Sequence, residues 1–88
     1  MQNFQPCLLI PVYNHGTLLE ATWSRLRAFN LPCILVDDGS DVATADALEN
    51  LAHTEPLITL LRLPHNSGKG AAVMRGIAEA HQRGYTHT

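Results

Sequence analysis

Two apolar runs, each followed directly by a polar turn, constrain the fold of this chain most strongly. The first run covers residues 8–12 and leads into Tyr13 and Asn14. The second covers residues 34–36 and leads into Asp37 and Asp38. The interval between the runs is long enough for a helix, so the pattern predicts a βαβ unit with parallel strands. Open α/β sheets bind ligands beyond the carboxyl ends of their strands. We therefore expect these four polar residues to lie side by side on one rim.

An aromatic face beside paired carboxylates suits a nucleotide. The ring of Tyr13 can stack on a base, and Asp37 or Asp38 can accept hydrogen bonds from base N–H groups or ribose hydroxyls. Two plainer interpretations stay open: the acidic pair is a polar loop that favours the following helix N-terminus, or Tyr13 is ordinary packing at the rim.

The length and composition indicate one small globular domain over residues 1–88. The chain is 45% hydrophobic and 16% charged, and its net charge is −2. Without a basic patch, nucleic-acid binding has no electrostatic support. The N-terminus does not have the pattern of a signal peptide, and no apolar run reaches the length of a membrane span. We expect a cytoplasmic protein, with membrane association only through parts outside this sequence.

The two cysteines, Cys7 and Cys33, each stand at the start of an apolar run. We expect buried free thiols in a reducing compartment. A disulfide is the alternative, because neighbouring parallel strands can bring such positions close. Two distant cysteines supply too few ligands for a zinc site.

Three βα units in series account for nearly the whole chain. The capping-box pattern of Thr17 and Glu20 begins the first helix, Ser40 or Asp41 caps the second, and Gly84 follows the third. Residues 37–41 are expected to form a loop. The predicted strands cover residues 7–12, 33–36 and 57–63, and the predicted helices cover residues 17–29, 41–53 and 70–83.

Right-handed crossovers favour one parallel sheet with helices on its faces. The fold class is therefore α/β, a partial Rossmann-like fold in three layers. Residues 85–88 resemble the approach to a fourth strand, so we expect a domain truncated before that strand. The apolar residues expected to face the sheet are Leu19, Trp23 and Leu26 on the first helix, Ala45, Leu48, Leu51 and Ala52 on the second, and Val73, Met74, Ile77 and Ala78 on the third.

The third loop, residues 65–70, lies between a strand and a helix. Its glycines allow backbone N–H groups to approach an anion, and Lys69 adds a full charge at the helix N-terminus. The loop is thus a candidate diphosphate cradle, with a glycine-rich turn and a solvated lysine as the plainer interpretation. It is not a P-loop, because Leu63 and Gly70 occupy positions that need glycine and Ser or Thr. Val73 likewise breaks the dinucleotide fingerprint.

Together, the three loops resemble the N-terminal part of a family 2 glycosyltransferase, a group with the GT-A fold. The resemblance covers residues 7–85 and is closest to the polyprenyl- or dolichyl-phosphate sugar transferase type. It is carried by Ile10-Pro11-Val12-Tyr13-Asn14, by Val36-Asp37-Asp38-Gly39-Ser40, and by Asn66-Ser67-Gly68-Lys69-Gly70 followed by Ala71, Ala72 and Gly76.

The resemblance implies a site for the nucleotide of a UDP- or GDP-sugar. In that family, the residues matching Asp38 bind the base, and those matching Asp37 hold the loop or the ribose. Lys69 would approach the diphosphate. The expected nucleotide-sugar-binding residues are Pro11, Val12, Tyr13, Asn14, Asp37, Asp38, Gly68, Lys69 and Gly70.

The same resemblance implies inverting transfer of a sugar to an acceptor hydroxyl or lipid phosphate, in cell-envelope polysaccharide or glycolipid synthesis. The D-x-D element that holds Mn²⁺ or Mg²⁺ and the catalytic base are expected beyond Thr88. We therefore expect no catalytic residue and no bound metal within these residues, and a fragment that is inactive alone.

The same pattern has two alternative interpretations. A receiver-like signalling domain fits poorly, because it needs its acidic pair after the first strand, where Tyr13 and Asn14 stand. A noncatalytic nucleotide-binding or scaffold module keeps all three loops and stays open. Trp23 is expected in the core rather than as a sugar platform, and Arg25 and Arg62 are expected to be surface charges.

Overall fold

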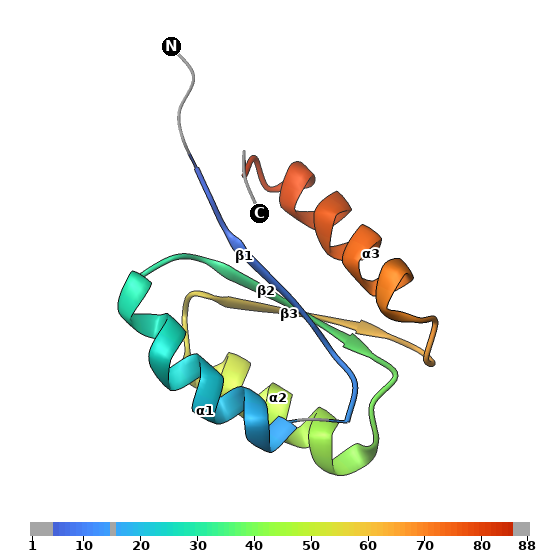
Figure 1. The fold of residues 1–88 in the computed structure, drawn as a ribbon. Helices are drawn as coiled ribbons and strands as arrows, with labels where there is room; N and C mark the ends of the chain where they lie inside the picture. The colour runs from blue at the N-terminus through green and yellow to red at the C-terminus, as the bar shows by residue number, and fades with distance from the viewer. Residues whose placement is uncertain (1–4, 15, 86–88) are drawn as a thin grey trace.

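The chain forms three layers, with a parallel β-sheet between helices (Figure 1). This computed structural model describes residues 5–14 and 16–85, and for residues 16–20 it describes the backbone only. The predicted capping box of Thr17 and Glu20 and the predicted core position of Leu19 lie outside the described side chains. The α/β class and the three βα units are as the sequence predicts.

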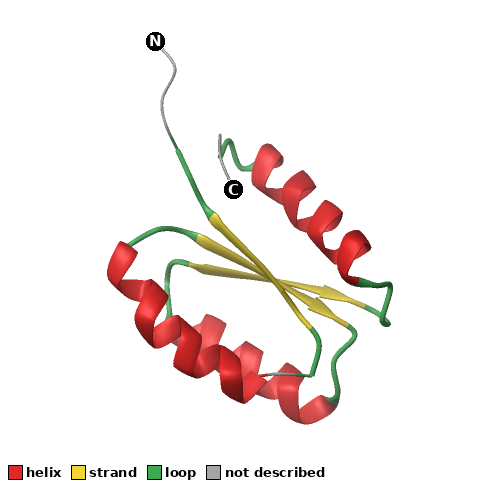
Figure 2. Ribbon diagram, in the orientation of Figure 1, coloured by secondary structure: helices red, strands yellow, loops and turns green. Residues whose placement is uncertain are grey.

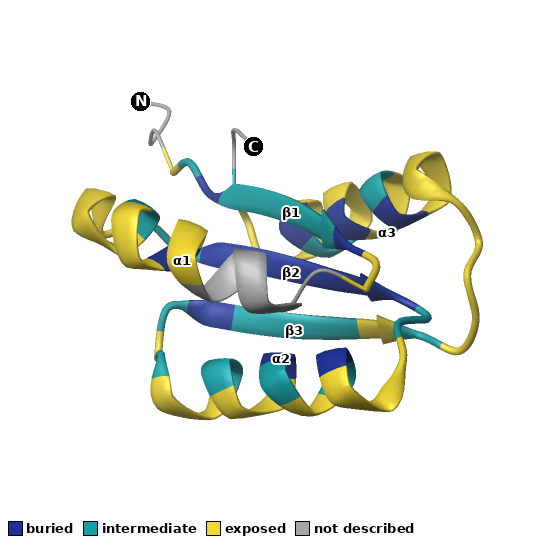
Figure 3. Cartoon of the chain, turned by 60° about the horizontal axis from the view of Figure 1, so that its bottom comes forward, coloured by how far each residue is buried: buried dark blue, intermediate teal, exposed yellow. Residues whose placement is uncertain are grey.

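The sheet contains β1 (Leu8–Val12), β2 (Cys33–Asp38) and β3 (Ile58–Leu63), all parallel and in the order β1-β2-β3. β2 lies between β1 and β3, and each of its residues is buried (Figure 3). The prediction that Asp37 and Asp38 begin a loop is wrong, because both continue the ladder of β2. Asp37 pairs with Val12 on one side and with Arg62 on the other.

Two helices cover one face of the sheet and one helix covers the other (Figures 1 and 2). The two are α1 (Gly16–Leu26), which continues as a short 3-10 turn (Arg27–Phe29), and α2 (Val42–Thr54); the single helix is α3 (Lys69–Gln82). Asp41 caps α2 by accepting a hydrogen bond from the Thr44 N–H at 2.9 Å. Gly84 follows α3 with φ +84°. The predicted cap of α2 and the predicted glycine after α3 are both confirmed.

Each face of the sheet has its own apolar core, because side chains alternate along a strand. On the α1/α2 face, Leu35 packs with Trp23 and Leu48. On the α3 face, Ile34 and Val36 pack with Ala72 and Ala80. Trp23 is buried, as the sequence predicts for a core residue.

The inward face of α3 differs from the prediction. Ala72, Gly76 and Ala80 are buried, whereas Met74 is 66% exposed and Ile77 is 41% exposed. A Cβ on Gly76 would overlap the Leu9 side chain. Small residues four positions apart therefore bring this helix close to the sheet, and the larger apolar residues are left outside.

The two thiols lie on opposite faces of the sheet and are free. The prediction of buried free cysteines is confirmed, and the alternative of a disulfide does not occur. Burial and the neighbouring Cys7 raise the pKa of the Cys33 thiol to about 12. Within residues 5–14 and 16–85, no helix has the length and apolarity needed to cross a membrane.

Candidate functional site

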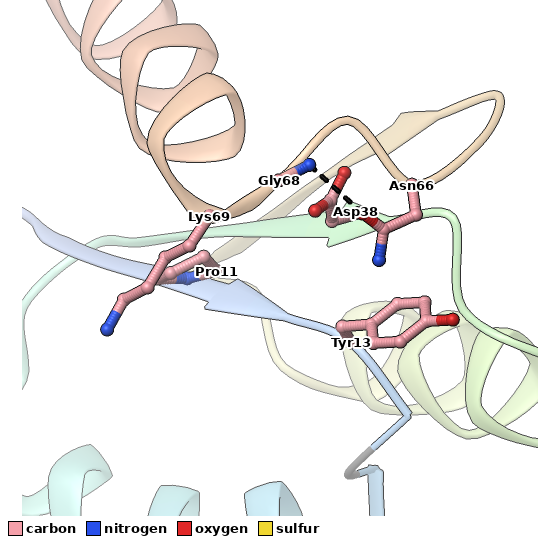
Figure 4. Close-up of a pocket in the computed structure, with 6 residues that line it drawn as sticks. All are labelled: Pro11, Tyr13, Asp38, Asn66, Gly68 and Lys69. Carbon is pink, nitrogen blue, oxygen red and sulfur yellow. Dashed lines mark hydrogen bonds between the residues drawn. The ribbon is translucent and has the colours of Figure 1, made fainter.

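A pocket of about 340 Å³ lies beyond the carboxyl ends of the strands. The ends of β1 and β2, the loop after β1, the loop after β3 and the start of α3 contribute to it (Figure 4). The described residues that line it are Pro11, Tyr13, Asp38, Asn66, Gly68 and Lys69.

The two adjacent carboxylates point to opposite faces of the sheet because they are successive residues of β2. Asp37 shares the α1/α2 face with Leu35, and Asp38 shares the α3 face with Val36. Only Asp38 lines the pocket. The strand register therefore separates a pair that looks equivalent in the sequence.

Asp38 is 3% exposed and is fixed by the third loop. Its Oδ1 accepts a hydrogen bond from the Ser67 N–H at 2.8 Å. No described residue donates a hydrogen bond to its Oδ2. A carboxylate held through one oxygen can direct the other toward a ligand donor in the pocket.

Asp37 is 1% exposed and does not line the pocket. Its Oδ1 accepts from the Ser40 N–H at 2.9 Å, and its Oδ2 accepts from Arg62 Nε at 3.3 Å. Its hydrogen bonds hold the turn after β2. Arg62 is exposed, as predicted for a surface charge, and it is also the ion-pair partner of this buried carboxylate.

Asn14 joins the first loop to the second. Its N–H donates to Ser40 Oγ at 3.0 Å, and its Oδ1 accepts from the Asp41 N–H at 2.8 Å. Its backbone is left-handed, with φ +56°, a conformation that asparagine tolerates better than most residues. The side chain is thus occupied in joining loops, next to Tyr13.

Gly39 brings the second and third loops together. Its φ is +73°, and a Cβ there would overlap the backbone of His65 and Asn66. Glycine is needed at this position both for the left-handed backbone and for the close approach. The turn after β2 therefore contacts the loops on both sides.

The third loop presents the start of α3 to the pocket. The Gly68 N–H donates to Asn66 Oδ1 at 3.0 Å (Figure 4), and Gly68, with φ +93°, is the N-cap residue directly before α3. Within the described chain, no side chain caps this helix start. Its first backbone N–H groups are therefore available to an anion, and Lys69 adds positive charge beside them.

The pocket has two chemically different ends. In Figure 4, Tyr13 and Asn66 lie toward one end and Lys69 lies toward the other. Tyr13 is 45% exposed, so a flat ligand can reach it. The arrangement offers an aromatic face and a carboxylate at one end and positive charge at the other.

Five of the nine predicted site residues line the pocket, and the other four are not among its described lining residues. Pro11, Tyr13, Asp38, Gly68 and Lys69 line the pocket. The others are not among the described lining residues: Val12 is in the core, Asn14 and Asp37 hold loops, and Gly70 is exposed.

Two residues of the site were missed as candidates. Asn66 belongs to the third sequence motif, and only the fold shows that it lines the pocket. Arg62 could have been found only from the strand register, which sets it opposite Asp37.

The described residues do not form a metal centre. Within residues 5–14 and 16–85, no group of three or more His, Cys, Asp or Glu side chains could hold a metal ion. Asp38 is a lone carboxylate in the pocket, which does not fit the ligand set of a divalent cation.

Comparisons with known proteins identify similar sequences. Residues 7–85 match the family model described as glycosyl transferase family 2. A dolichyl-phosphate beta-glucosyltransferase of Dictyostelium discoideum is 43% identical over 91 residues, a match that covers 88% of this chain and 28% of that enzyme. One from Trichomonas vaginalis is 37% identical over 87 residues, which is 86% of this chain and 25% of that enzyme. The chain thus spans about a quarter of the length of these relatives.

A solved structure shares the fold. A mannosyltransferase of Pyrobaculum calidifontis, in complex with GDP-Man and Mn²⁺, superposes with a TM-score of 0.74 at 24% identity, over 89% of this chain and 25% of that one. The similarity shows a GT-A-like, Rossmann-like arrangement of the three βα units. With the family model matched over nearly the whole sequence, the chain belongs to glycosyl transferase family 2.

Proposed function

We propose that this chain binds the nucleotide of a UDP- or GDP-sugar, as the donor-binding part of an inverting glycosyltransferase. The observation that carries the proposal is the position of Asp38. This carboxylate is buried, is held by Ser67 through one oxygen, and faces the pocket. A buried carboxylate with a free acceptor position suits an N–H donor of a uracil or guanine ring.

The aromatic end of the pocket accounts for the base and ribose. Tyr13 presents its ring beside Asp38, and Pro11 adds an apolar surface. Stacking of a base on an aromatic side chain contributes about 1–3 kcal/mol where it has been measured by alanine substitution. Asn14 and Asp37 act indirectly: Asn14 holds the loop that carries Tyr13, and Asp37 holds the turn that directly follows Asp38.

The positive end accounts for the diphosphate. The first N–H groups of α3 and the Lys69 ammonium favour negative charge, which increases on the leaving diphosphate during sugar transfer. Gly68 keeps this approach open, because nothing lies within 4 Å of its missing Cβ. These groups would bind and orient the donor.

The complete enzyme, in this proposal, transfers the sugar to a hydroxyl or a lipid phosphate. The relatives named as dolichyl-phosphate glucosyltransferases support a lipid phosphate acceptor. The neighbour with Mn²⁺ supports a divalent metal in the complete enzyme. We assign neither the metal ligands nor the catalytic base to the described residues.

The test is calorimetric titration of the chain with UDP, GDP and, for comparison, ADP. Asp38→Asn retains an oxygen for the Ser67 N–H and replaces the free oxygen with an NH₂ group. A hydrogen bond involving a charged group contributes about 1.5–3 kcal/mol, so affinity should fall roughly 10- to 150-fold. The control is Asp46→Asn, an exposed carboxylate on α2 that should leave affinity unchanged.

The titration also separates the two ends of the pocket. Lys69→Ala should weaken UDP or GDP much more than the corresponding nucleoside, because only the diphosphate reaches the positive end. Folded protein that binds neither UDP nor GDP would refute the proposal. Equal binding by Asp38→Asn and the unaltered chain would refute the role of Asp38.

A further inference from the structure

Arg62 links three groups that belong to different parts of the fold. From β3, Arg62 Nε donates to Asp37 Oδ2 at 3.3 Å. Arg62 Nη2 lies 3.3 Å from both Ala45 O and Glu49 Oε1 on α2. Asp37 is almost fully buried, whereas Arg62 is partly exposed and Glu49 is exposed. The guanidinium therefore connects a buried carboxylate at the end of β2 to the outer surface of α2.

The partners of Asp37 determine what this connection does. A buried charge needs both a counter-charge and hydrogen bonds. Arg62 supplies the counter-charge on Oδ2, and the Ser40 N–H satisfies Oδ1. Because one carboxylate takes both bonds, the position of its Oδ1, and with it the Ser40 backbone, depends on where Arg62 holds Oδ2.

The same turn continues to the pocket. Ser40 Oγ accepts from the Asn14 N–H, and Asn14 Oδ1 accepts from the Asp41 N–H. Asn14 directly follows Tyr13, and Asp37 directly precedes Asp38. Arg62 thus lies at the start of a chain of hydrogen bonds that ends at Asn14, the residue next to Tyr13 of the pocket, although Arg62 is not among the described lining residues.

We propose that Arg62 is a positioning residue for the nucleotide pocket, acting through Asp37 and Ser40 on the loop that carries Tyr13. The inference rests on the proposed function. The fork of the guanidinium matters as well as its charge: it reaches Asp37 and α2 from two different nitrogens, which one ammonium cannot do from a single position. Arg62→Lys should therefore keep the fold and lose the positioning.

The first test needs no nucleotide. Amide NMR spectra of the unaltered chain, of Arg62→Lys and of Arg62→Gln should show displaced Ser40 and Asn14 signals in both variants. The control is Arg25→Gln, an exposed arginine on α1 that should leave both signals in place. Unmoved Ser40 and Asn14 signals in folded Arg62 variants would overturn the inference.

The second test is a double-mutant cycle in nucleotide affinity. Arg62→Lys and Asn14→Ala should each weaken UDP or GDP binding at least about fivefold, a low value for coupling between separate positions. Together they should weaken it by less than the product of the two effects, because both act through one turn. If Arg62 served stability alone, Arg62→Lys would leave nucleotide affinity unchanged, or its effect on affinity would multiply with that of Asn14→Ala. Either result would overturn the inference.

The outcomes separate the two proposals. If the unaltered chain binds neither UDP nor GDP, the proposed function fails, and the inference is then decided by the Ser40 and Asn14 signals alone. If the nucleotide binds but folded Arg62 variants bind equally well, only the inference fails. If Arg62→Lys and Arg62→Gln both unfold, Arg62 serves stability and the inference is overturned.

Discussion

Replacing Gly39 with alanine should reduce the free energy of unfolding by about 2–5 kcal/mol, because two costs add. A left-handed backbone costs an L-residue roughly 1–2 kcal/mol, and the φ of Gly39 is +73°. The new Cβ would also lie 2.8 Å from His65 Cα and overlap neighbouring backbone atoms. Relief of such overpacking costs about 1–3 kcal/mol.

A second glycine isolates the backbone cost. Gly84 has φ +84°, but nothing lies within 4 Å of its missing Cβ. Gly84→Ala should therefore lose only the roughly 1–2 kcal/mol of the left-handed conformation. The difference between the two losses of unfolding free energy measures the steric cost of placing a Cβ between the turn after β2 and the loop after β3.

Urea unfolding followed by fluorescence of Trp23, the only tryptophan, measures both variants. Small domains have stabilities of about 5–15 kcal/mol, so the Gly39→Ala transition should remain visible at a much lower midpoint. Its loss should exceed that of Gly84→Ala by at least about 1 kcal/mol. Equal losses would refute the packing of these two loops against each other.

Three further predictions concern the core, the thiols and the acid response. Leu48→Ala should cost about 2–5 kcal/mol in urea unfolding, whereas Val42→Ala, on the exposed side of α2, should cost far less. Because burial and Cys7 raise the pKa of Cys33 to about 12, Cys33 should resist alkylation at pH 8 until urea exposes it, and rapid labelling of the native chain would contradict its burial. Arg83 and Arg75 lower the pKa of Glu79 below its ordinary 4.5, so the stability that this pairing contributes is present above that pH and is lost as the pH falls through the lowered pKa. Glu79→Gln should reduce the decline in stability between pH 6 and pH 3, and an unchanged decline would exclude this role.

Local patterns in the sequence were sufficient to predict the elements. Strands that are buried on both faces appear as short apolar runs, and residues such as Asp41 and Gly84 mark helix ends by chemistry that depends only on near neighbours. These signals placed the three loops at one edge of the sheet, with Tyr13 and Asp38 close together.

The errors came from packing that involves distant segments. The inward face of α3 was assigned to large residues such as Met74, but close approach to the sheet requires the small side chains of Ala72 and Gly76. Arg62 is exposed as predicted, but its ion pair with Asp37 becomes apparent only when β3 is aligned with β2. The register between strands depends on packing throughout the core, so it cannot be derived from a single sequence.

The central claim is that the pocket between Tyr13 and Lys69 holds a nucleoside diphosphate with its base against Asp38. An amide and side-chain NMR titration of the chain with UDP and then GDP tests it most directly. We expect shifts concentrated at Tyr13, Asp38 and Gly68 to Lys69, with contacts between the Tyr13 ring and the base or ribose. A well-dispersed spectrum in which these signals stay fixed at millimolar nucleotide, or in which shifts gather elsewhere, would contradict it.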